Sequence, residues 1–296
     1  MRRAVAVGPG HGVARRDLQR PRREGEVLDR HRGSRRIDRH RQRDQHERRE
    51  QRHRPEADRS PSYPHTISTV PLVAADARLV PLVRELERIP FKLGPGVIER
   101  CARYGALLIQ RNTDVNLTAI TEPADIARKH FADSFSALAV RRWTGRERLI
   151  DVGSGAGFPG LALRLALPGL VASTLELDGV EIRNERAESL VTERRERYDV
   201  ATARAVGTLG AVIEYLLPFL HIGGEAIAWK GRLDAELEGG RKACAAIGGE
   251  IVAIRSTADL GLGDILPGRS LVVVRKIRST PLRFPRAPVD AKRRPW

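Results

Sequence analysis

The chain has 296 residues, and its 53 Lys or Arg outnumber its 37 Asp or Glu to give a formal charge of +16. This length suits one sizeable domain with appended segments. The two cysteines, Cys101 and Cys244, exclude a disulfide framework and a cysteine-rich zinc site. No apolar run is long enough to span a membrane, and the run from Ala4 to Val7 is too short for the core of a secretory signal, so we expect a cytoplasmic protein.

Residues 1–66 differ in composition from the rest. The first 60 residues hold 19 Arg, no Lys, ten acidic residues and no aromatic residue. Such a segment buries too little apolar surface to offset the entropy lost on ordering, so we predict a disordered Arg-rich extension. Its charge would also suit an arm that binds RNA. The interspersed acids and the missing aromatics favour a segment with no such role.

Residues 67–140 are predicted to be helical. Between Val80 and Arg111 apolar residues recur every three or four positions, which indicates two helices separated by residues 90–95. A loop from Asn116 then leads into a third helix over residues 125–138, on which His130 shares a face with apolar residues.

From residue 149 the pattern changes to short apolar runs that alternate with helical stretches. Strands are predicted at 149–152, 171–175, 180–183, 198–203, 225–230, 250–255 and 271–275, with helices at 160–167, 209–220 and 233–247. This alternation indicates a largely parallel sheet covered by helices on both faces, over residues 141–280. A basic tail, residues 281–296, follows.

The most specific local signal is a glycine-rich turn between the first strand and the first helix of this region. It reads Asp151-Val152-Gly153-Ser154-Gly155-Ala156-Gly157-Phe158-Pro159-Gly160. Glycines allow a ligand to approach the backbone closely. The turn lies at the carboxyl end of a strand, where open parallel sheets bind their ligands.

Two cofactors compete for this turn, and a turn without any ligand is the least favoured alternative. Read from Gly155, the turn matches the Gly-x-Gly-x-x-Gly pattern of dinucleotide sites, with a pyrophosphate at the helix N-terminus. Read from Asp151, it offers a carboxylate to the ammonium group of S-adenosylmethionine. Because a carboxylate would repel a pyrophosphate, S-adenosylmethionine is favoured. Glu176, or failing that Asp178, is expected to bind the ribose at the end of the second strand.

Taken together, the motifs resemble one family, the bacterial 16S rRNA guanine-N7 methyltransferases, known as RsmG or glucose-inhibited division protein B. The resemblance covers about residues 80–290. In chain order its motifs are Asn116-Leu117-Thr118-Ala119-Ile120, Lys129-His130 with Asp133-Ser134, the glycine-rich turn, Arg186-Ala187-Glu188, Thr202-Ala203-Arg204-Ala205-Val206 and Lys230-Gly231. The glycine-rich turn is common to many methyltransferases, whereas its combination with the upstream motifs is much more specific.

The resemblance implies a Rossmann-like class I methyltransferase sheet, S-adenosylmethionine as cofactor, and the 16S rRNA of the small ribosomal subunit as partner of a monomeric enzyme. It implies that Gly153, Phe158, Ala187, Glu188 and Arg204 bind the cofactor, together with Asp151, Gly155 and Glu176, which the local pattern already indicates. Ala187 and Glu188 would flank the adenine, Glu188 from a loop after the strand at 180–183. The substrate side would comprise Asn116, Lys129, His130, Arg204 and Lys230.

Two of these assignments keep a structural alternative. Arg204 would reach the cofactor or the target base, and an ion pair with Asp151 is an equally open role for it. For His130 and Asp133, bridging of the third helix to the sheet is favoured over a catalytic role.

The sequence departs from the family at one place. Only Leu177, Asp178 and Gly179 separate the predicted strand ending near Glu176 from the strand that begins at Val180. Parallel neighbours need a crossover of about a dozen residues, so the crossover helix is predicted to be missing. An inactive RNA-binding relic is therefore one alternative function, and an NAD(P)-dependent oxidoreductase is the other.

The implied reaction needs no catalytic acid or base. N7 of guanine carries no proton, so the enzyme must chiefly align the nitrogen, the methyl group and the sulfur. The sequence lacks the motifs with which other methyltransferases hold an exocyclic amine. It also lacks a cysteine suited to attack a pyrimidine. The target guanine should be unstacked, because N7 lies in the narrow groove of A-form RNA. Lys129, Lys230, Arg283, Arg286 and Lys292 are candidates for holding phosphates.

Overall fold

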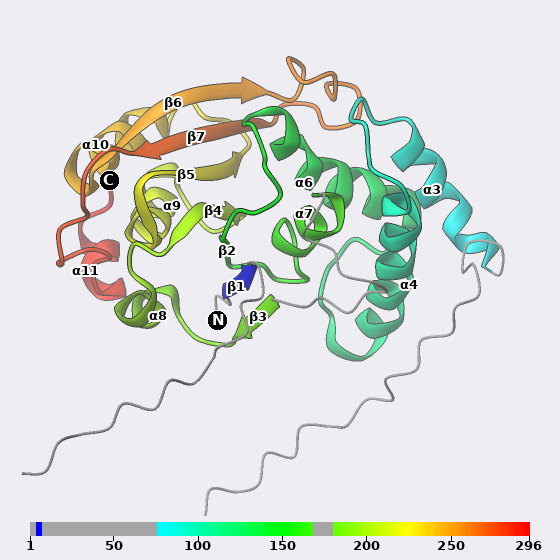
Figure 1. Ribbon diagram of the computed structural model, residues 1–296, viewed down its shortest axis with the longest axis horizontal. Helices are drawn as coiled ribbons and strands as arrows, with labels where there is room; N and C mark the ends of the chain where they lie inside the picture. Colours follow the sequence, from blue (N-terminus) through cyan, green and yellow to red (C-terminus); the bar gives the residue numbers. More distant parts are fainter. Residues whose placement is uncertain (1–3, 8–75, 168–179) are drawn as a thin grey trace, which may run out of the picture. The chain divides into compact units, whose positions relative to one another are not determined.

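A computed structural model describes residues 4–7, 76–167 and 180–296 of the chain, and a seven-stranded sheet lies at the centre of this part (Figure 1). The predicted strand at 171–175, with Glu176, Asp178 and the proposed missing crossover, lies outside the described residues. Within them, no helix has the length and apolar character needed to cross a membrane.

The sheet has the strand order β3-β1-β2-β4-β5-β7-β6. Its strands are β1 Ala4–Val7, β2 Leu149–Val152, β3 Val180–Arg183, β4 Tyr198–Arg204, β5 Leu220–Lys230, β6 Gly249–Ser256 and β7 Ser270–Lys276. β2, β4 and β5 are parallel neighbours, while β1 and β7 each run antiparallel to both of their neighbours. Five strands therefore share one direction, which confirms the predicted Rossmann-like α/β fold.

Strand β1 corrects the prediction for the first residues of the chain. Ala4–Val7 was assigned to the disordered extension, but it lies between β2 and β3, with Ala4 opposite both Val152 and Arg183. Unpaired backbone groups at the edge of β2 gain partners from this strand, which favours its pairing. The run Ala4–Val7 was considered only as a secretory signal, and its partners β2 and β3 lie more than 140 residues away, which is why the strand was missed.

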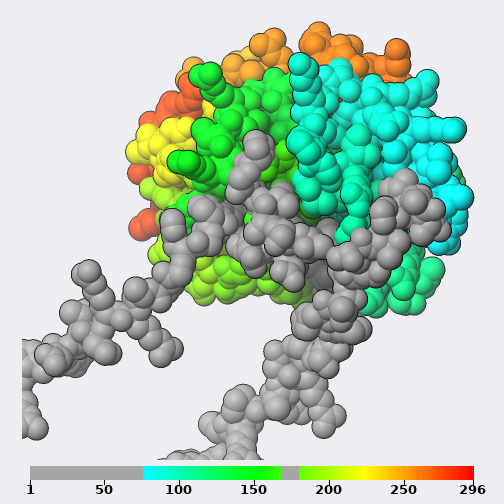
Figure 2. Space-filling view, turned by 45° about the vertical axis from the view of Figure 1, so that its right-hand side comes forward, coloured from blue at the N-terminus to red at the C-terminus, as the bar shows by residue number. Residues whose placement is uncertain are grey.

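The predicted helical region contains three helical stretches. α3 covers Val80–Glu87, after the short η1 Ala77–Leu79, and α4 covers Val97–Val115. The third stretch changes its winding along its length, from α5 Pro123–Asp125 through the π-helical η2 Ile126–Ala132 and α6 Asp133–Phe135 to η3 Ser136–Ala139. In Figure 2 the cyan residues of α3 and α4 lie against the green residues that follow them in the chain.

The remaining helices are α7 Gly160–Ala166, α8 Ala187–Arg194, α9 Leu209–Leu216 with η4 Leu217–Phe219, α10 Leu237–Ile247 and α11 Pro288–Arg293. α8 stands where a loop was expected around Glu188. Its apolar residues are few and do not make a marked helical stripe, so periodicity could not detect it.

Alternate strand residues face two different cores. Ile150 and Ala201 pack with α8, α9 and α10, whereas Leu149 and Val200 pack with α7 and the end of the third helical stretch. Figure 1 shows the two layers on opposite sides of the sheet. A third cluster of buried residues joins α3, α4 and the third stretch to α7. The helical region is thereby anchored beside the glycine-rich turn.

Candidate active site

The glycine-rich turn leaves open space beside one of its glycines. Gly155 has a φ of 55°, in the left-handed region, and a Cβ added there would meet no atom within 4 Å. A Cβ at Gly153 would come within 2.8 Å of Val206. The space at Gly155 is therefore where a ligand can approach the backbone of the turn.

Asp151 connects the first strand of the site to its neighbours. Its side chain is fully buried, and its carboxylate accepts hydrogen bonds from the Gly160 N–H at 2.8 Å and the Thr202 hydroxyl at 2.9 Å. Burial raises the pKa of Asp151 to about 6, although these hydrogen bonds oppose the shift. In this conformation the carboxylate joins β2 to α7 and β4, and its contact with a cofactor ammonium group remains a prediction.

A column of rings links the helical region to the turn. The Phe158 ring stacks on His130 with centroids 4.5 Å apart and on Tyr104 with centroids 5.3 Å apart. The Tyr104 hydroxyl, which comes from α4, donates a hydrogen bond to the Ala156 carbonyl inside the turn. A Cβ at Gly157 would collide with this hydroxyl. The shape of the turn thus depends on a residue outside the sheet.

His130 is neutral, and its contacts show which ring nitrogen carries the proton. Nδ1 lies 3.1 Å from Nη2 of Arg204, and a guanidinium group can only donate. Nδ1 must therefore accept, which leaves the proton on Nε2, 3.0 Å from the Thr118 hydroxyl. Burial, followed by the charges of Arg204 and Arg269, lowers the pKa of His130 to about 4.

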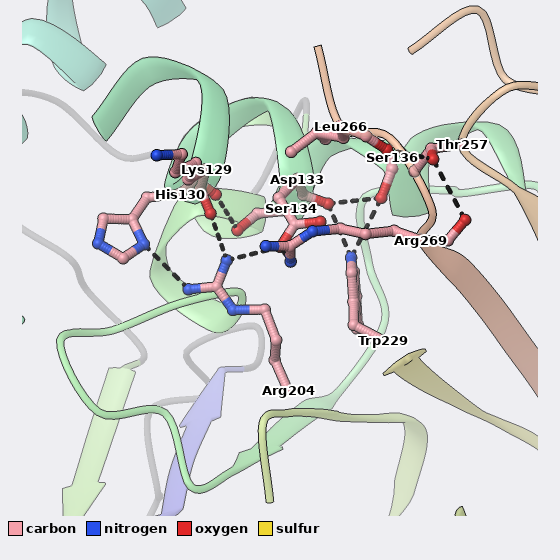
Figure 3. Close-up of polar contacts among 10 residues, drawn as sticks. All are labelled: Lys129, His130, Asp133, Ser134, Ser136, Arg204, Trp229, Thr257, Leu266 and Arg269. Atoms are coloured by element: carbon pink, nitrogen blue, oxygen red, sulfur yellow. Dashed lines mark hydrogen bonds and ion pairs between the residues drawn. The ribbon is translucent and has the colours of Figure 1, made fainter. Parts of the chain in front are cut away.

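Asp133 is the centre of an ion-pair cluster, shown in Figure 3. Its side chain is fully buried, and Nη1 of Arg204 and Nη1 of Arg269 both lie 2.9 Å from its Oδ2 atom. Its other oxygen, Oδ1, is buried without a hydrogen-bond partner. Burial raises the pKa of Asp133 against the opposing effect of the two arginines. The ion-pair partner of Arg204 in this structure is Asp133 and not Asp151.

The loop that begins the family's upstream motif is held by the side chain of Asn112, near the end of α4. The Thr118 N–H donates to the Asn112 carboxamide oxygen at 2.8 Å, and the Asn112 amide donates to the Thr118 carbonyl at 2.9 Å. Asn116 itself is exposed and has a φ of 42°, in the left-handed region, at the end of α4. Thr118, rather than Asn116, is the residue of this motif that contacts His130.

The two predicted lysines have acidic partners. Lys129 forms an ion pair with Asp125 at 2.8 Å, and about half of its side chain is exposed. Lys230 lies at the end of β5, pairs with Glu236 at 2.6 Å and donates to the Gly207 carbonyl. Lys230 therefore stabilises the loop that follows Arg204.

The predicted adenine residues lie at the start of α8. Ala187 is buried, while Glu188 forms an ion pair with Arg186 at 3.3 Å. Glu188 also lines a cavity of about 400 Å³, together with Tyr215 of α9 and Lys292 of α11. Of the predicted tail cations, Arg286 is engaged in the interior by Glu214 at 2.6 Å.

Sequence reasoning missed three residues of the site. Tyr104 was seen only as part of a helical stripe, and Arg269 and Trp229 were not singled out. The Trp229 indole donates to the Asp133 carbonyl at 2.7 Å. Trp229 lies near the end of the predicted strand at 225–230, and Arg269 lies just before the strand at 271–275. These positions are weak signals, because their common partner Asp133 is 96 and 136 residues away.

The parallel central strands, the glycine-rich turn at their carboxyl edge and the clustered Thr118, His130 and Arg204 define a class I, Rossmann-like methyltransferase. Comparison with known proteins agrees. The family model described as rRNA small subunit methyltransferase G matches residues 97–260, and the chain belongs to this family.

The chain is similar to proteins named ribosomal RNA small subunit methyltransferase G in several bacteria. It is 37% identical to that of Dehalococcoides mccartyi, over 71% of this chain and 97% of the relative. The protein of Roseiflexus castenholzii is 39% identical, over 66% and 91% of the two chains. That of Alkaliphilus oremlandii is 36% identical, over 64% and 86%. None of these findings favours an oxidoreductase or an inactive relic.

Proposed function

We propose that the protein transfers a methyl group from S-adenosylmethionine to N7 of a guanine in 16S rRNA, as a cytoplasmic monomer. The observation that carries the proposal is the open space at Gly155 beside Phe158, His130 and Arg204, in a chain of the methyltransferase G family. The named relatives are ribosomal RNA methyltransferases, which supports the choice of substrate.

The residues present fit the proposed cofactor. Bound S-adenosylmethionine supplies an electrophilic methyl group on its sulfonium. A Cβ at Gly155 would meet no atom within 4 Å, so the backbone of the turn is open there to an adenosyl group. Asp151, Gly153, Gly155, Phe158, Ala187, Glu188 and Arg204 are the described residues proposed to hold the cofactor.

The charge states of the site suit a reaction without a general base. His130 uses Nδ1 to accept from Arg204 and donates its one ring proton toward Thr118, so neither nitrogen is available to remove a proton. Asp133 is engaged by two arginines. Since guanine N7 has no proton to lose, these residues are proposed to orient the reactants.

Arg204 is proposed to act from a fixed position. Its side chain is held at four points, by the Lys129 carbonyl, Asp133, His130 and the face of the Phe158 ring. Ala205, which follows it, has a φ of 56°, in the left-handed region, and strained backbone of this kind is concentrated at functional sites. The substrate roles of Asn116, Lys129 and Lys230 are proposed to be indirect or at the rim, because Asn116 and Lys129 are exposed and both lysines have acidic partners.

The proposal is tested by methylation of 16S rRNA that lacks the modification, supplied both as naked RNA and in small subunits. We expect labelled methyl to enter one guanine, and chemical cleavage at N7-methylguanine to identify the atom. In Gly155→Asn the new residue can adopt the left-handed backbone conformation, but its side chain fills the open space. This variant should therefore lose cofactor binding while remaining folded. Arg84→Gln, at an exposed position of α3, is the control. Methylation at another atom, or full activity of Gly155→Asn, would contradict the proposal.

A further inference from the structure

Two arginines bind Asp133, and they differ in how many of their N–H groups remain available to a ligand. Arg204 and Arg269 approach the same carboxylate oxygen at the same distance, 2.9 Å, from different parts of the chain (Figure 3). The Arg204 side chain is 15% exposed, and that of Arg269 is 39% exposed. The less buried of the two is the one that the sequence did not single out.

Most of the donors of Arg204 are already used. Nη1 donates to the Lys129 carbonyl and to Asp133, and Nη2 donates to His130. These contacts take three of the five N–H groups of a guanidinium. Arg204 is therefore fixed in the wall of the site.

Arg269 has one such contact, from Nη1 to Asp133, among the described residues. The other N–H groups of its guanidinium project from a partly exposed side chain. Arg269 ends the loop between β6 and β7, and β6 runs in the same direction as β5, so this loop lies at the carboxyl edge of the sheet with the glycine-rich turn. Its free donors are thus on the side where parallel sheets bind ligands.

Arg269 shares its carboxylate partner with a second arginine. Asp133 provides one negative charge for the two guanidinium groups, and His130 is neutral because its Nδ1 accepts from Arg204. Lys129 shares Asp125 with Arg128. Asp151 interacts electrostatically with Arg204, so the charge that is open to a ligand is that of Arg269, the more exposed of the two arginines.

We propose that Arg269 binds a backbone phosphate of the substrate RNA beside the target guanine. Asp133 holds one corner of the guanidinium, so that its remaining planar edge is preorganised for the two oxygens of a phosphate. This inference rests on the proposed function. It assigns the RNA contact to Arg269, whereas Arg204 forms the fixed wall.

The test compares Arg269→Gln and Arg269→Lys with the wild type in methylation kinetics between 50 and 200 mM salt. Arg269→Gln should raise the KM for RNA about tenfold, as expected for loss of one charged hydrogen-bonded contact. For this variant the slope of log KM plotted against log salt concentration should also be smaller by about 0.7, the value for one phosphate contact with a single strand. Arg269→Lys keeps the charge, so it should keep most of the slope with a smaller rise in KM. Affinity for S-adenosylhomocysteine should not change.

The control is Arg84→Gln, which removes one exposed positive charge from α3 and should leave both KM values and the slope unchanged. An unaltered slope for Arg269→Gln, or a loss of cofactor affinity in step with the rise in KM, would overturn the inference. If the wild type methylates rRNA and Arg269→Gln behaves like it, only this inference fails. If the wild type methylates no rRNA, the proposed function itself fails.

Discussion

Glu214 and Asp133 are both buried carboxylates that bind arginine, but they differ in how many of their oxygens have partners. Glu214 on α9 accepts from the backbone and guanidinium of Arg286 and from the indole of Trp296, and both of its oxygens are used. Asp133 offers one oxygen to two arginines and leaves the other buried without a partner. Burial opposes ionisation at both, yet the pKa of Glu214 is lowered by its hydrogen bonds, whereas that of Asp133 is raised.

The difference is the one expected between an ion pair that only stabilises the fold and one that positions residues for function. Glu214 fixes the C-terminal residues onto α9, so the basic tail expected to hold phosphates is partly used as structure. Asp133 lies at the carboxyl edge of the sheet and orients arginines toward the site. Unlike Glu214, Asp133 keeps one buried oxygen without a hydrogen-bond partner, and we propose that it orients the two arginines rather than serving stability alone.

The largest expected effect is on stability, from Glu214→Gln. The amide leaves Arg286 without its charged partner in a mostly buried site, so the free energy of unfolding should fall by about 3 kcal/mol. Urea denaturation measures this, and the kcat of the folded protein should be retained. Glu238→Gln, at an exposed position of α10, is the matched control. A loss of activity larger than the loss of stability would remove the contrast with Asp133.

Asp133→Asn should show the reverse pattern. The amide cannot hold two guanidinium groups, so Arg204 and His130 lose their alignment, and kcat/KM should fall about 100-fold. Stability should fall less than in Glu214→Gln, because the native state already disfavours the charge of Asp133. Steady-state kinetics beside urea denaturation measure both quantities. An Asp133→Asn protein with normal kcat/KM would show that the cluster is purely structural.

A third buried carboxylate, Asp151, is expected to make the stability of the protein depend on pH. Its folded pKa of about 6 lies above its ordinary value of 3.8, so its contribution to stability is fully present below pH 3.8 and is lost as the pH rises through 6. Asp151→Asn does not titrate, so its stability relative to the wild type should increase by about 2 kcal/mol from pH 4 to pH 7. A constant difference across this range would contradict the assigned shift.

The smallest expected effect comes from Tyr104→Phe, which keeps the ring on Phe158 and removes only the hydroxyl that binds the Ala156 carbonyl. Loss of one hydrogen bond of about 1 kcal/mol should weaken cofactor binding about fivefold, measured by titration with S-adenosylhomocysteine. Tyr104→Ala, which also removes the ring, should weaken it further. Equal affinity in all three proteins would show that the turn keeps its shape without α4.

The fold was predictable where the signal is local. The period of α3 and α4 and the apolar runs of β2, β4 and β7 can be read within a window of a dozen residues. β1 was missed because its partners, β2 and β3, are more than 140 residues away and the strand has only four residues. The spacing of Asp151 to Gly160 predicted the position of the turn, because each glycine there satisfies a local steric need.

The site was predictable only in part for the same reason. The upstream motif and Arg204 were found, but Arg269 lies 136 residues from Asp133 and Tyr104 lies 52 residues from Ala156. No pattern of spacing connects such pairs without the fold. The sequence also could not show that Asp151 is fully enclosed or that Arg204 has spent most of its donors.

The account depends on the glycine-rich turn binding an adenosyl sulfur compound rather than a dinucleotide. Calorimetric titration of the full chain with S-adenosylhomocysteine and, separately, with NAD tests this directly. We predict one saturable site for S-adenosylhomocysteine, lost in Gly155→Asn, and no heat of binding with NAD. Saturable binding of NAD, with none of S-adenosylhomocysteine, would contradict the account.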